Sequence, residues 1–403
     1  MDAAGVRVLE ERARHAGRRA FGTGWQPTRI AIAPGRVELI GNHTDYNGGP
    51  VLCAAIDRWI VILADDDSAT EDIRLIGADI SRDEGRRINP RTSDDWHAAA
   101  GTHDVTDYVQ GAVAAIGARP GMTVQSGTRM AIAGDVPLGF GLSSSAALCV
   151  ATTLVIGAPQ PTPRELVLLA QEAEHRAGTP CGRMDQSASV HGGVIRFDGR
   201  TTESERRSPH LGNLVFAVMD SGVSRALSDS AYPVRVQEAA AACIAASSVL
   251  RKPISGLAEI TPNDLQELER SPAIEATLLQ RIRHIVTETE RVNLADVALQ
   301  AADWEAFGAL MDASGRSSAT DYAISHPRVE QLVAEARAVP GVLGARMMGG
   351  GEGGAAICLL PRESLPQLEA SLSAGYFREF GMAERSGLVQ PCAFSEGATL
   401  QRV

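Results

Sequence analysis

Lysine is nearly absent from this sequence. The 403-residue chain contains 38 basic residues, and only Lys252 among them is a lysine. The motif GxxxxGK[ST], whose lysine binds the terminal phosphates of a nucleotide, does not occur. If the chain binds a nucleotide, then backbone N–H groups, hydroxyls and arginines must hold its phosphates.

Long apolar runs and paired cysteines are missing as well. No run reaches the roughly 18 residues that a membrane-spanning helix needs, and residues 1–20 are typical of a charged amphipathic helix rather than a signal peptide. The six cysteines lie far apart without a CxxC pair, which argues against a zinc or disulfide framework. These features predict a cytoplasmic protein with reduced thiols and no membrane partner.

The chain also lacks the positive charge that a general nucleic-acid binder needs, since its formal net charge is −11. Anionic ligands must therefore be held by local groups. We expect a small-molecule ligand, no nucleic acid, and a monomer or weak homo-oligomer.

Apolar segments bounded by turn residues predict a mixed α/β (α+β) fold. The length suits two or three domains, and we expect an N-terminal domain at 1–200 and a more helical C-terminal domain at 201–403. The polar stretch 200–212 is expected to connect them. Strands are expected at 29–33, 51–63, 129–133 and 214–220, and helices at 107–117, 164–176, 234–250, 275–292, 295–302 and 304–314.

A glycine-spaced turn leads into three serines in residues 137–147, PLGFGLSSSAA. Glycines let the backbone approach an anion closely, and the N-terminus of the helix that follows offers free N–H groups to a phosphate. Serine hydroxyls can bind phosphate oxygens or hydrated Mg²⁺. The turn indicates a nucleotide-phosphate site, although a capped helix after a glycine turn has the same pattern.

Residues 34–49, PGRVELIGNHTDYNGG, are expected to form a polar loop between two apolar segments. A neutral sugar needs several donors and acceptors at fixed angles, and this loop supplies them. A polar turn closed by an Asx-type bond is the alternative. The candidate side chains are those of Arg36, Asn42, His43, Asp45, Tyr46 and Asn47.

Residues 174–186, EHRAGTPCGRMDQ, contain two carboxylates, Glu174 and Asp185. One could hold a metal ion and the other could accept a proton. For these two residues alone, a solvated pair with Arg183 as its surface partner is the simpler interpretation. Cys181 is expected to be a packed thiol rather than a nucleophile.

Five glycines occur within residues 349–354, GGGEGG, where either close approach to a ligand or a tight hairpin would explain them. Together and in this order, the four segments resemble the GHMP family of small-molecule kinases, and within it the galactokinases. The segment SDSAYPVR at 228–235 and the ending EGATLQRV are similar to that group as well. The resemblance implies a two-domain GHMP kinase fold with the active site in the interdomain cleft.

The resemblance implies an ATP- and Mg²⁺-dependent kinase that phosphorylates the C1 hydroxyl of a free sugar. Asp185 matches the family's base at that hydroxyl, and Arg36 matches the residue beside the transferring phosphate. Ser145 and Glu174 match the Mg²⁺ ligands. The matching nucleotide contacts are Gly139, Gly141, Leu142, Ser143, Ser144, Ser145 and Ala146. The matching sugar contacts are Asn42, His43, Asp45, Gly182 and Tyr232.

Three positions depart from the family pattern. Galactokinases have a Glu that reaches toward the C6 hydroxyl where this chain has Asn42. Phe140 replaces a glycine and is expected to narrow the nucleotide cleft, whereas Glu352 interrupts the last glycine loop and is expected to point away from phosphate. Because an amide donates as well as accepts, Asn42 predicts a C6-altered or longer sugar, such as the octose of lincosamide antibiotic assembly, rather than galactose.

Two other functions also fit the sequence. One is an ordinary galactokinase in which Asn42 is a tolerated substitution. The other is a non-catalytic regulator that binds sugar and ATP. Retention of Arg36, Asp185 and an uninterrupted GLSSSAA favours catalysis over regulation.

Overall fold

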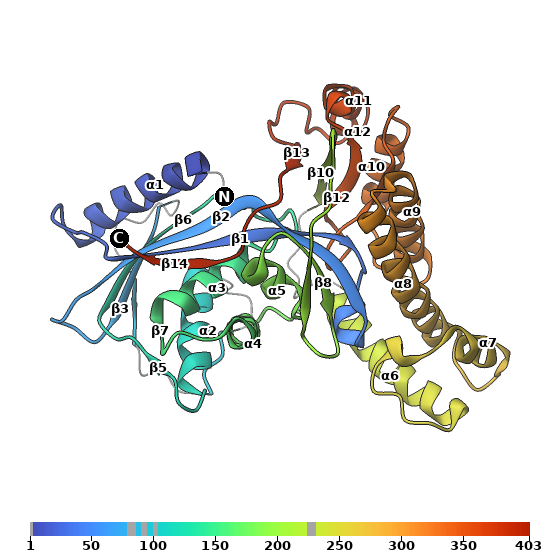
Figure 1. Cartoon of the computed structure of the whole chain (residues 1–403), viewed down its shortest axis with the longest axis horizontal. Helices are drawn as coiled ribbons and strands as arrows, with labels where there is room; N and C mark the ends of the chain where they lie inside the picture. The colour runs from blue at the N-terminus through green and yellow to red at the C-terminus, as the bar shows by residue number, and fades with distance from the viewer. Residues whose placement is uncertain (1–2, 79–85, 90–94, 100–103, 224–230) are drawn as a thin grey trace.

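The structure is a computed structural model that describes residues 3–78, 86–89, 95–99, 104–223 and 231–403. It has two main sheets (Figure 1). The larger one has the order β14-β1-β2-β6-β3-β4, with β8 paired to β2 and β9 paired to β8. The strands of this sheet are β1 (Arg29–Ile40), β2 (Pro50–Asp66), β3 (Ile73–Gly77), β4 (Arg86–Ile88), β6 (Thr128–Gly134), β8 (Val194–Asp198), β9 (Ser204–Arg207) and β14 (Thr399–Arg402).

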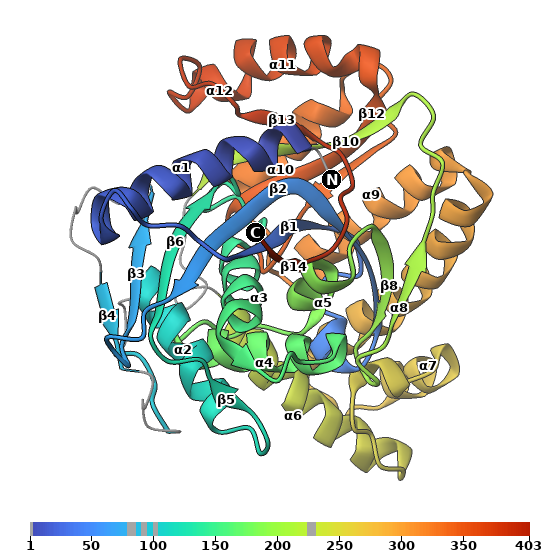
Figure 2. The ribbon, with the colours of Figure 1, turned by 60° about the vertical axis from the view of Figure 1, so that its left-hand side comes forward.

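Helices cover both faces of the larger sheet (Figure 2). The amphipathic helix α1 (Ala3–Phe21) packs Val6 and Leu9 against Ile30 and Val61 on one face. The helices on the other face are α2 (Val105–Gly117), α3 (Ser144–Ile156), α4 (Pro163–Arg176) and α5 (Met184–His191), and a small pair of strands, β5 (Thr123–Val124) and β7 (Gly157–Ala158), lies beside them.

The smaller sheet has the order β11-β12-β10-β13 and lies among the helices of the second half of the chain. None of the helices in the described ranges is long and apolar enough to cross a membrane. The strands of the smaller sheet are β10 (Leu214–Val223), β11 (Gly344–Met347), β12 (Gly354–Pro361) and β13 (Val389–Cys392). The helices of this half are α6 (Tyr232–Leu250), α7 (Pro262–Arg270), α8 (Ala276–Ala301), α9 (Trp304–Thr320), α10 (Pro327–Arg337), α11 (Leu365–Ala374) and α12 (Tyr376–Glu379).

One apolar core joins the two sheets. Side chains alternate across a strand, so β10 sends Phe216 and Val218 into the cluster that also holds Ile62 of β2, while Val215 and Ala217 face a second cluster among the helices of this half. The two halves are therefore packed against each other along a shared interior. β9 and β14 belong to the larger sheet although they follow residue 200, and the exact domain boundary stays a prediction.

The mixed α/β content is confirmed, but three sequence-based expectations were wrong. The segment PGRVEL belongs to β1 rather than to a loop, because it pairs with β2 as far as Ile40 and its polar side chains face a buried site. Residues 275–302 do not form two helices, since Ala295 and Leu299 continue the buried face of a single helix, α8. The expected connection at 200–212 contains β9. The start of the SDSAYPVR segment, residues 228–230, lies outside the described residues.

Candidate active site

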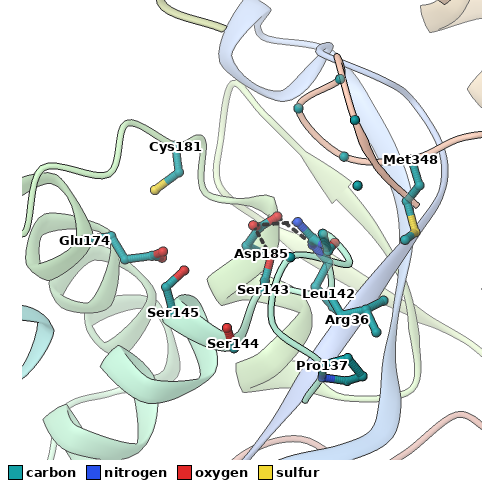
Figure 3. Close-up of a pocket in the computed structure, with 17 residues that line it drawn as sticks. Arg36, Pro137, Leu142, Ser143, Ser144, Ser145, Glu174, Cys181, Asp185 and Met348 are labelled. Atoms are coloured by element: carbon teal, nitrogen blue, oxygen red, sulfur yellow. Dashed lines mark hydrogen bonds and ion pairs between the residues drawn. The ribbon is translucent and has the colours of Figure 1, made fainter. Parts of the chain in front are cut away.

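An ion pair between Arg36 and Asp185 lies at the centre of the candidate site (Figure 3). Arg36 Nε donates to Asp185 Oδ1 at 2.7 Å, and Arg36 Nη2 donates to Oδ2 at 2.6 Å. Arg36 Nη1 also donates to the Gly141 carbonyl, and the Ser143 hydroxyl donates to Asp185. Burial disfavours the charged guanidinium, but the adjacent Asp185 carboxylate outweighs burial and raises the Arg36 pKa. The pair is bidentate, which is the strongest form of such a contact.

Three chain segments bring this pair together. Arg36 lies on β1, and Asp185 lies in the first turn of α5. The serine turn is attached to β1 because the Arg36 N–H donates to the Leu142 carbonyl at 3.0 Å. Gly35 permits this approach, since a Cβ there would lie 2.7 Å from the same carbonyl oxygen. The Arg36 side of the pair is thus held by the backbone of the serine turn.

A cleft of about 200 Å³ opens beside the ion pair. Its floor is the serine turn, in which Gly139 and Gly141 have positive φ angles that favour glycine. Ser143, the residue before α3, makes no side-chain cap to the helix, because its hydroxyl donates to Asp185. No cap therefore competes with an anion for the first N–H groups of α3. Of the expected nucleotide contacts, the cleft is lined by Gly139, Gly141, Leu142, Ser143, Ser144 and Ser145, whereas Ala146 is buried in α3.

The glycine-rich loop forms the opposite wall of the cleft through Gly349, Gly350 and its neighbours. Glu352 is not among the lining residues, and its Oε2 accepts a hydrogen bond from the Ala231 N–H at 2.6 Å. The prediction that Glu352 points away from the cleft is confirmed. Phe140 packs against the apolar core and does not line the cleft, so the expected narrowing by this residue was wrong.

Glu174 and Ser145 both line the cleft (Figure 3). Glu174 is buried, and this burial raises its pKa to about 7, with a further rise from Asp185 and opposing hydrogen bonds from Ser145 and Gln186. A solvated surface pair is therefore excluded. Arg183 donates instead to Gln171 and Thr202.

A hydroxyl beside a buried carboxylate is a hard oxygen donor set of the kind that Mg²⁺ prefers. Within the described ranges, no group of three or more His, Cys, Asp or Glu residues could hold a metal by itself. Ser145 and Glu174 thus fit the expected metal site.

A second pocket of about 60 Å³ adjoins the cleft and shares Arg36, Cys181, Asp185, Gly349 and Gly350 with it. Four of the expected sugar contacts line this pocket, namely His43, Asp45, Gly182 and Tyr232. The pocket also contains Glu38, Pro180 and Met184, which the sequence analysis did not select. Burial raises the pKa of the Cys181 thiol well above its usual value, as expected of a packed thiol.

His43 is held in a neutral state. Its ring lies 5.1–5.6 Å, between centroids, from the rings of Tyr46, Tyr232 and Tyr322, and its Nδ1 is 2.9 Å from the Tyr46 hydroxyl. Burial, followed by the nearby His284, lowers the His43 pKa to about 3. Its Nε2 is buried without a well-formed hydrogen bond in the described part of the chain. The backbone of Gly350 makes a contact that favours the charged ring, and a sugar hydroxyl would supply a better-aligned partner.

Asp45 and Gly182 lie in direct contact at the pocket. Burial, then the charge of Asp185, raises the Asp45 pKa to about 6. A side chain at position 182 would collide with the Asp45 carboxylate, so glycine is required there. Asp45 therefore offers a charged acceptor that becomes a weaker, neutral one when it takes up a proton near pH 6.

Asn42 does not line the pocket, contrary to its expected role as a sugar contact. Its Nδ2 donates to the Gly349 carbonyl at 2.9 Å and to Glu38 Oε1 and Oε2 at 3.1 and 3.2 Å. Its Oδ1 accepts from the Ser318 hydroxyl at 3.1 Å. The amide is thus satisfied by the protein, and the carboxylate in the pocket belongs to Glu38.

Residues of α8 bond to the backbone of the turn that follows β1, at Gly41 and Asn42. Glu288 accepts from the N–H groups of Gly41 and Asn42, and its pKa is lowered to about 2 because Arg291 and His284 outweigh its burial. His284 Nε2 lies 3.0 Å from the Asn42 carbonyl oxygen. No local pattern in the sequence pointed to these residues, because they act across the packed interior.

Comparisons with known proteins agree with this geometry. The galactokinase galactose-binding signature matches residues 18–65, and the GHMP kinase N-terminal and C-terminal domains match residues 107–193 and 297–377. Human galactokinase is 36% identical over 382 residues, which cover 92% of this chain and 93% of the human protein. The chain belongs to the GHMP kinase family. Within it, the chain is a galactokinase-like sugar kinase, and the galactokinase of a Roseiflexus species is 35% identical over 93% of each chain.

Solved GHMP kinases share the fold along nearly the whole chain. Lactococcus lactis galactokinase complexed with galactose has a TM-score of 0.85 and 27% identity, covering 97% of this chain and 99% of that one. A mevalonate kinase has a TM-score of 0.61 at 17% identity, covering 91% and 98%, which shows the fold alone. The predicted two-domain GHMP fold is confirmed, and kinases of this family use ATP.

The contacts of Asn42 predict that Asn42→Glu destabilises this kinase. A second carboxylate beside the buried Glu38 would be repelled and could not donate to Gly349 or Glu38 as the amide does, at a cost of about 2–4 kcal/mol in unfolding free energy. Denaturant unfolding measures this cost. The double variant Glu38→Gln/Asn42→Glu should recover part of it, and wild-type stability of Asn42→Glu would contradict the arrangement described here.

The buried Glu174 predicts a pH-dependent stability of the metal-free kinase. Its folded-state pKa is raised from 4.5 to about 7, so its contribution to stability is complete below about pH 4.5 and is lost as the pH rises to 7. The melting temperature of the wild type should therefore fall over this interval relative to Glu174→Gln. A constant difference between the two proteins from pH 4.5 to 7.5 would show that Glu174 does not titrate there.

Proposed function

We propose that the chain transfers the γ-phosphate of ATP to the C1 hydroxyl of a free sugar. One observation carries this proposal: the phosphate-type cleft and the polar pocket meet at Arg36 and Asp185, which line both. A phosphate donor and a hydroxyl acceptor bound in the two compartments would react at that junction. Such placement accounts for a large part of the acceleration in phosphoryl transfer.

Asp185 is the base in this reaction. Its carboxylate takes the proton of the C1 hydroxyl as the sugar oxygen bonds to the γ-phosphorus, and the bond from that phosphorus to the bridging oxygen of ADP breaks. Arg36, which is paired with Asp185 and lines both compartments, stabilises the charge that spreads over the transferring group. The Ser143 hydroxyl orients Asp185 through its hydrogen bond.

The serine turn and the N-terminus of α3 hold the β- and γ-phosphates, and Ser145 with Glu174 holds Mg²⁺. When bound, Mg²⁺ neutralises phosphate charge. A third cavity of about 550 Å³ begins at Ser144 and Ser145 and continues along apolar side chains. Its size and lining suit the base and ribose of the nucleotide. The apolar and aromatic side chains there are those of Ile60, Val105, Tyr108, Ile132, Val136, Leu138 and Leu148.

Two kinds of sugar are candidates. Galactose is the sugar in the names of the relatives, and the pocket offers acceptors from Glu38 and Asp45 to its hydroxyls. A C6-altered or longer sugar, such as an octose of antibiotic assembly, follows from the interpretation of Asn42. Because the Asn42 amide is occupied by Glu38, Gly349 and Ser318, it gives no reason to exclude galactose, which is the first substrate to test.

The test is an assay of ATP consumption with galactose, other hexoses and an eight-carbon aldose, with ³¹P NMR to locate the phosphate on C1. We expect a sugar 1-phosphate from at least one of them. Sugar and ATP binding without any product would favour the non-catalytic regulator instead.

Asp185→Asn should retain nucleotide binding and lose about 10²- to 10⁴-fold in kcat, because a general base contributes on this order. Arg36→Lys should lose about 10²-fold or more, since an ammonium cannot replace the planar fork. Steady-state kinetics with the best sugar gives both values. Near-normal kcat in either variant would remove that residue from the chemical step.

Glu174→Gln should raise the Mg²⁺ concentration needed for half-maximal rate, because a hard cation loses an anionic oxygen. Ser145→Ala should have the same effect to a smaller degree. Titration of the rate with Mg²⁺ at fixed ATP measures it. Wild-type Mg²⁺ dependence in both variants would place the metal elsewhere.

A further inference from the structure

We propose that Glu38 determines the sugar specificity of this kinase, by accepting a hydrogen bond from the hydroxyl at the end of the sugar remote from C1. This inference rests on the proposed function. The carboxylate recognises a neutral sugar that carries a free hydroxyl donor at C6 or at the equivalent position of a longer chain. It disfavours sugars that are deoxygenated or acidic there.

The geometry of β1 places the side chain of Glu38 on the same face as that of Arg36. Arg36 and Glu38 pair with Ala55 and Cys53 of β2 without a register shift between them, so their side chains leave the same face of β1. Residues two apart on a strand are separated by about 7 Å, which is comparable with the width of a pyranose ring. Arg36 and Glu38 both line this pocket, so a sugar with its C1 hydroxyl at Arg36 would have its remote end within reach of Glu38.

The contacts of Glu38 leave it able to accept a further hydrogen bond. Its Oε1 accepts from Arg346 Nη1 at 2.8 Å and from Asn42 Nδ2 at 3.1 Å. Among the residues that the structure describes, Oε2 has only the shared Asn42 bond at 3.2 Å. A carboxylate oxygen has two acceptor sites. Oε2 therefore retains an acceptor site for a ligand, and it does so in a pocket where His43 Nε2 also lacks a well-formed partner.

The buried ion pair between Glu38 and Arg346 is not well explained by a contribution to folding stability alone. Glu38 is 2% exposed and Arg346 is fully buried, and Arg346 Nε and Nη2 are buried without hydrogen-bond partners in the described residues. A buried pair of this kind contributes little net stability compared with apolar side chains. The charge of Glu38 is explained if it binds the ligand in the pocket. A ligand without the matching hydroxyl would leave this buried acceptor unpaired, and the site would therefore select strongly against such a ligand.

The experiment compares wild type with Glu38→Gln, using the best sugar of the panel and its 2-deoxy and 6-deoxy analogues. Glutamine keeps an acceptor but loses the charge, so kcat/KM for the parent sugar should fall roughly tenfold. The loss should appear mainly in KM, because the contact is remote from the reacting atoms. The 2-deoxy analogue, which retains the remote hydroxyl, should show the same loss, whereas the 6-deoxy analogue should show almost none.

Asp65→Asn is the matched control for lost stability. Asp65 is also a buried carboxylate paired with an arginine, Arg129, but it lies on β2 beside Trp25, away from the pocket. It should lower the melting temperature without changing the ratio of the three sugars. If Glu38→Gln does not fold, Glu38→Asp tests the same contact, because it keeps the charge but shortens the reach, and it should show the same dependence on the 6-hydroxyl.

An equal loss with all three sugars, or a loss confined to kcat, would overturn the inference and leave Glu38 as a support for Arg36 and Asp45. Unchanged kinetics would overturn it too. These results leave the proposed function intact, whereas a wild type that phosphorylates no sugar contradicts the proposed function itself and, with it, this inference.

Discussion

The bidentate ion pair between Arg36 and Asp185 is the contact on which the rest of the site depends. It ties β1 to the first turn of α5, and the Gly141 carbonyl and the Ser143 hydroxyl attach the serine turn to the same two side chains. Because these bonds come from three segments, the phosphate cleft and the sugar pocket are positioned relative to each other by one set of contacts. A bound sugar and a bound nucleotide would therefore be aligned without a large rearrangement of either wall.

The sugar pocket depends equally on the packing of the two sheets. Arg346 reaches Glu38 from β11, and Glu288 and His284 reach the loop after β1 from α8. Each of these groups is buried and is therefore costly unless it is paired or neutral. The low pKa of His284, about 4, removes one charge from this interior. The remaining buried charges, on Glu38, Glu288 and Arg346, lie beside the pocket where we expect a polar ligand to be recognised.

Much of the site could be predicted from the sequence because its main parts are local patterns. The serine turn combines glycines, serines and a helix start within eleven residues, and Arg36 and Asp185 stand in short motifs. The supporting residues could not be predicted in this way, since Arg346 and His284 meet the sugar loop only after the sheets pack. Glu38 was within reach, because alternation along an extended β1 places it on the face of Arg36. It was missed because PGRVEL was interpreted as a loop.

The interpretation of Asn42 shows why one position is a poor guide to specificity. An amide at 42 looked like a lost charge, but the charge is present four residues earlier, and the amide donates to it. With a carboxylate at 38, a second carboxylate at 42 would be repelled, whereas an amide can donate to Glu38 and Gly349 and accept from Ser318. The two residues therefore act as a pair, in which the Asn42 amide fixes the Glu38 carboxylate by hydrogen bonds and the carboxylate lines the pocket. If the proposed function is correct, selectivity for the sugar would depend on this pair, together with Arg346, the buried arginine that neutralises Glu38.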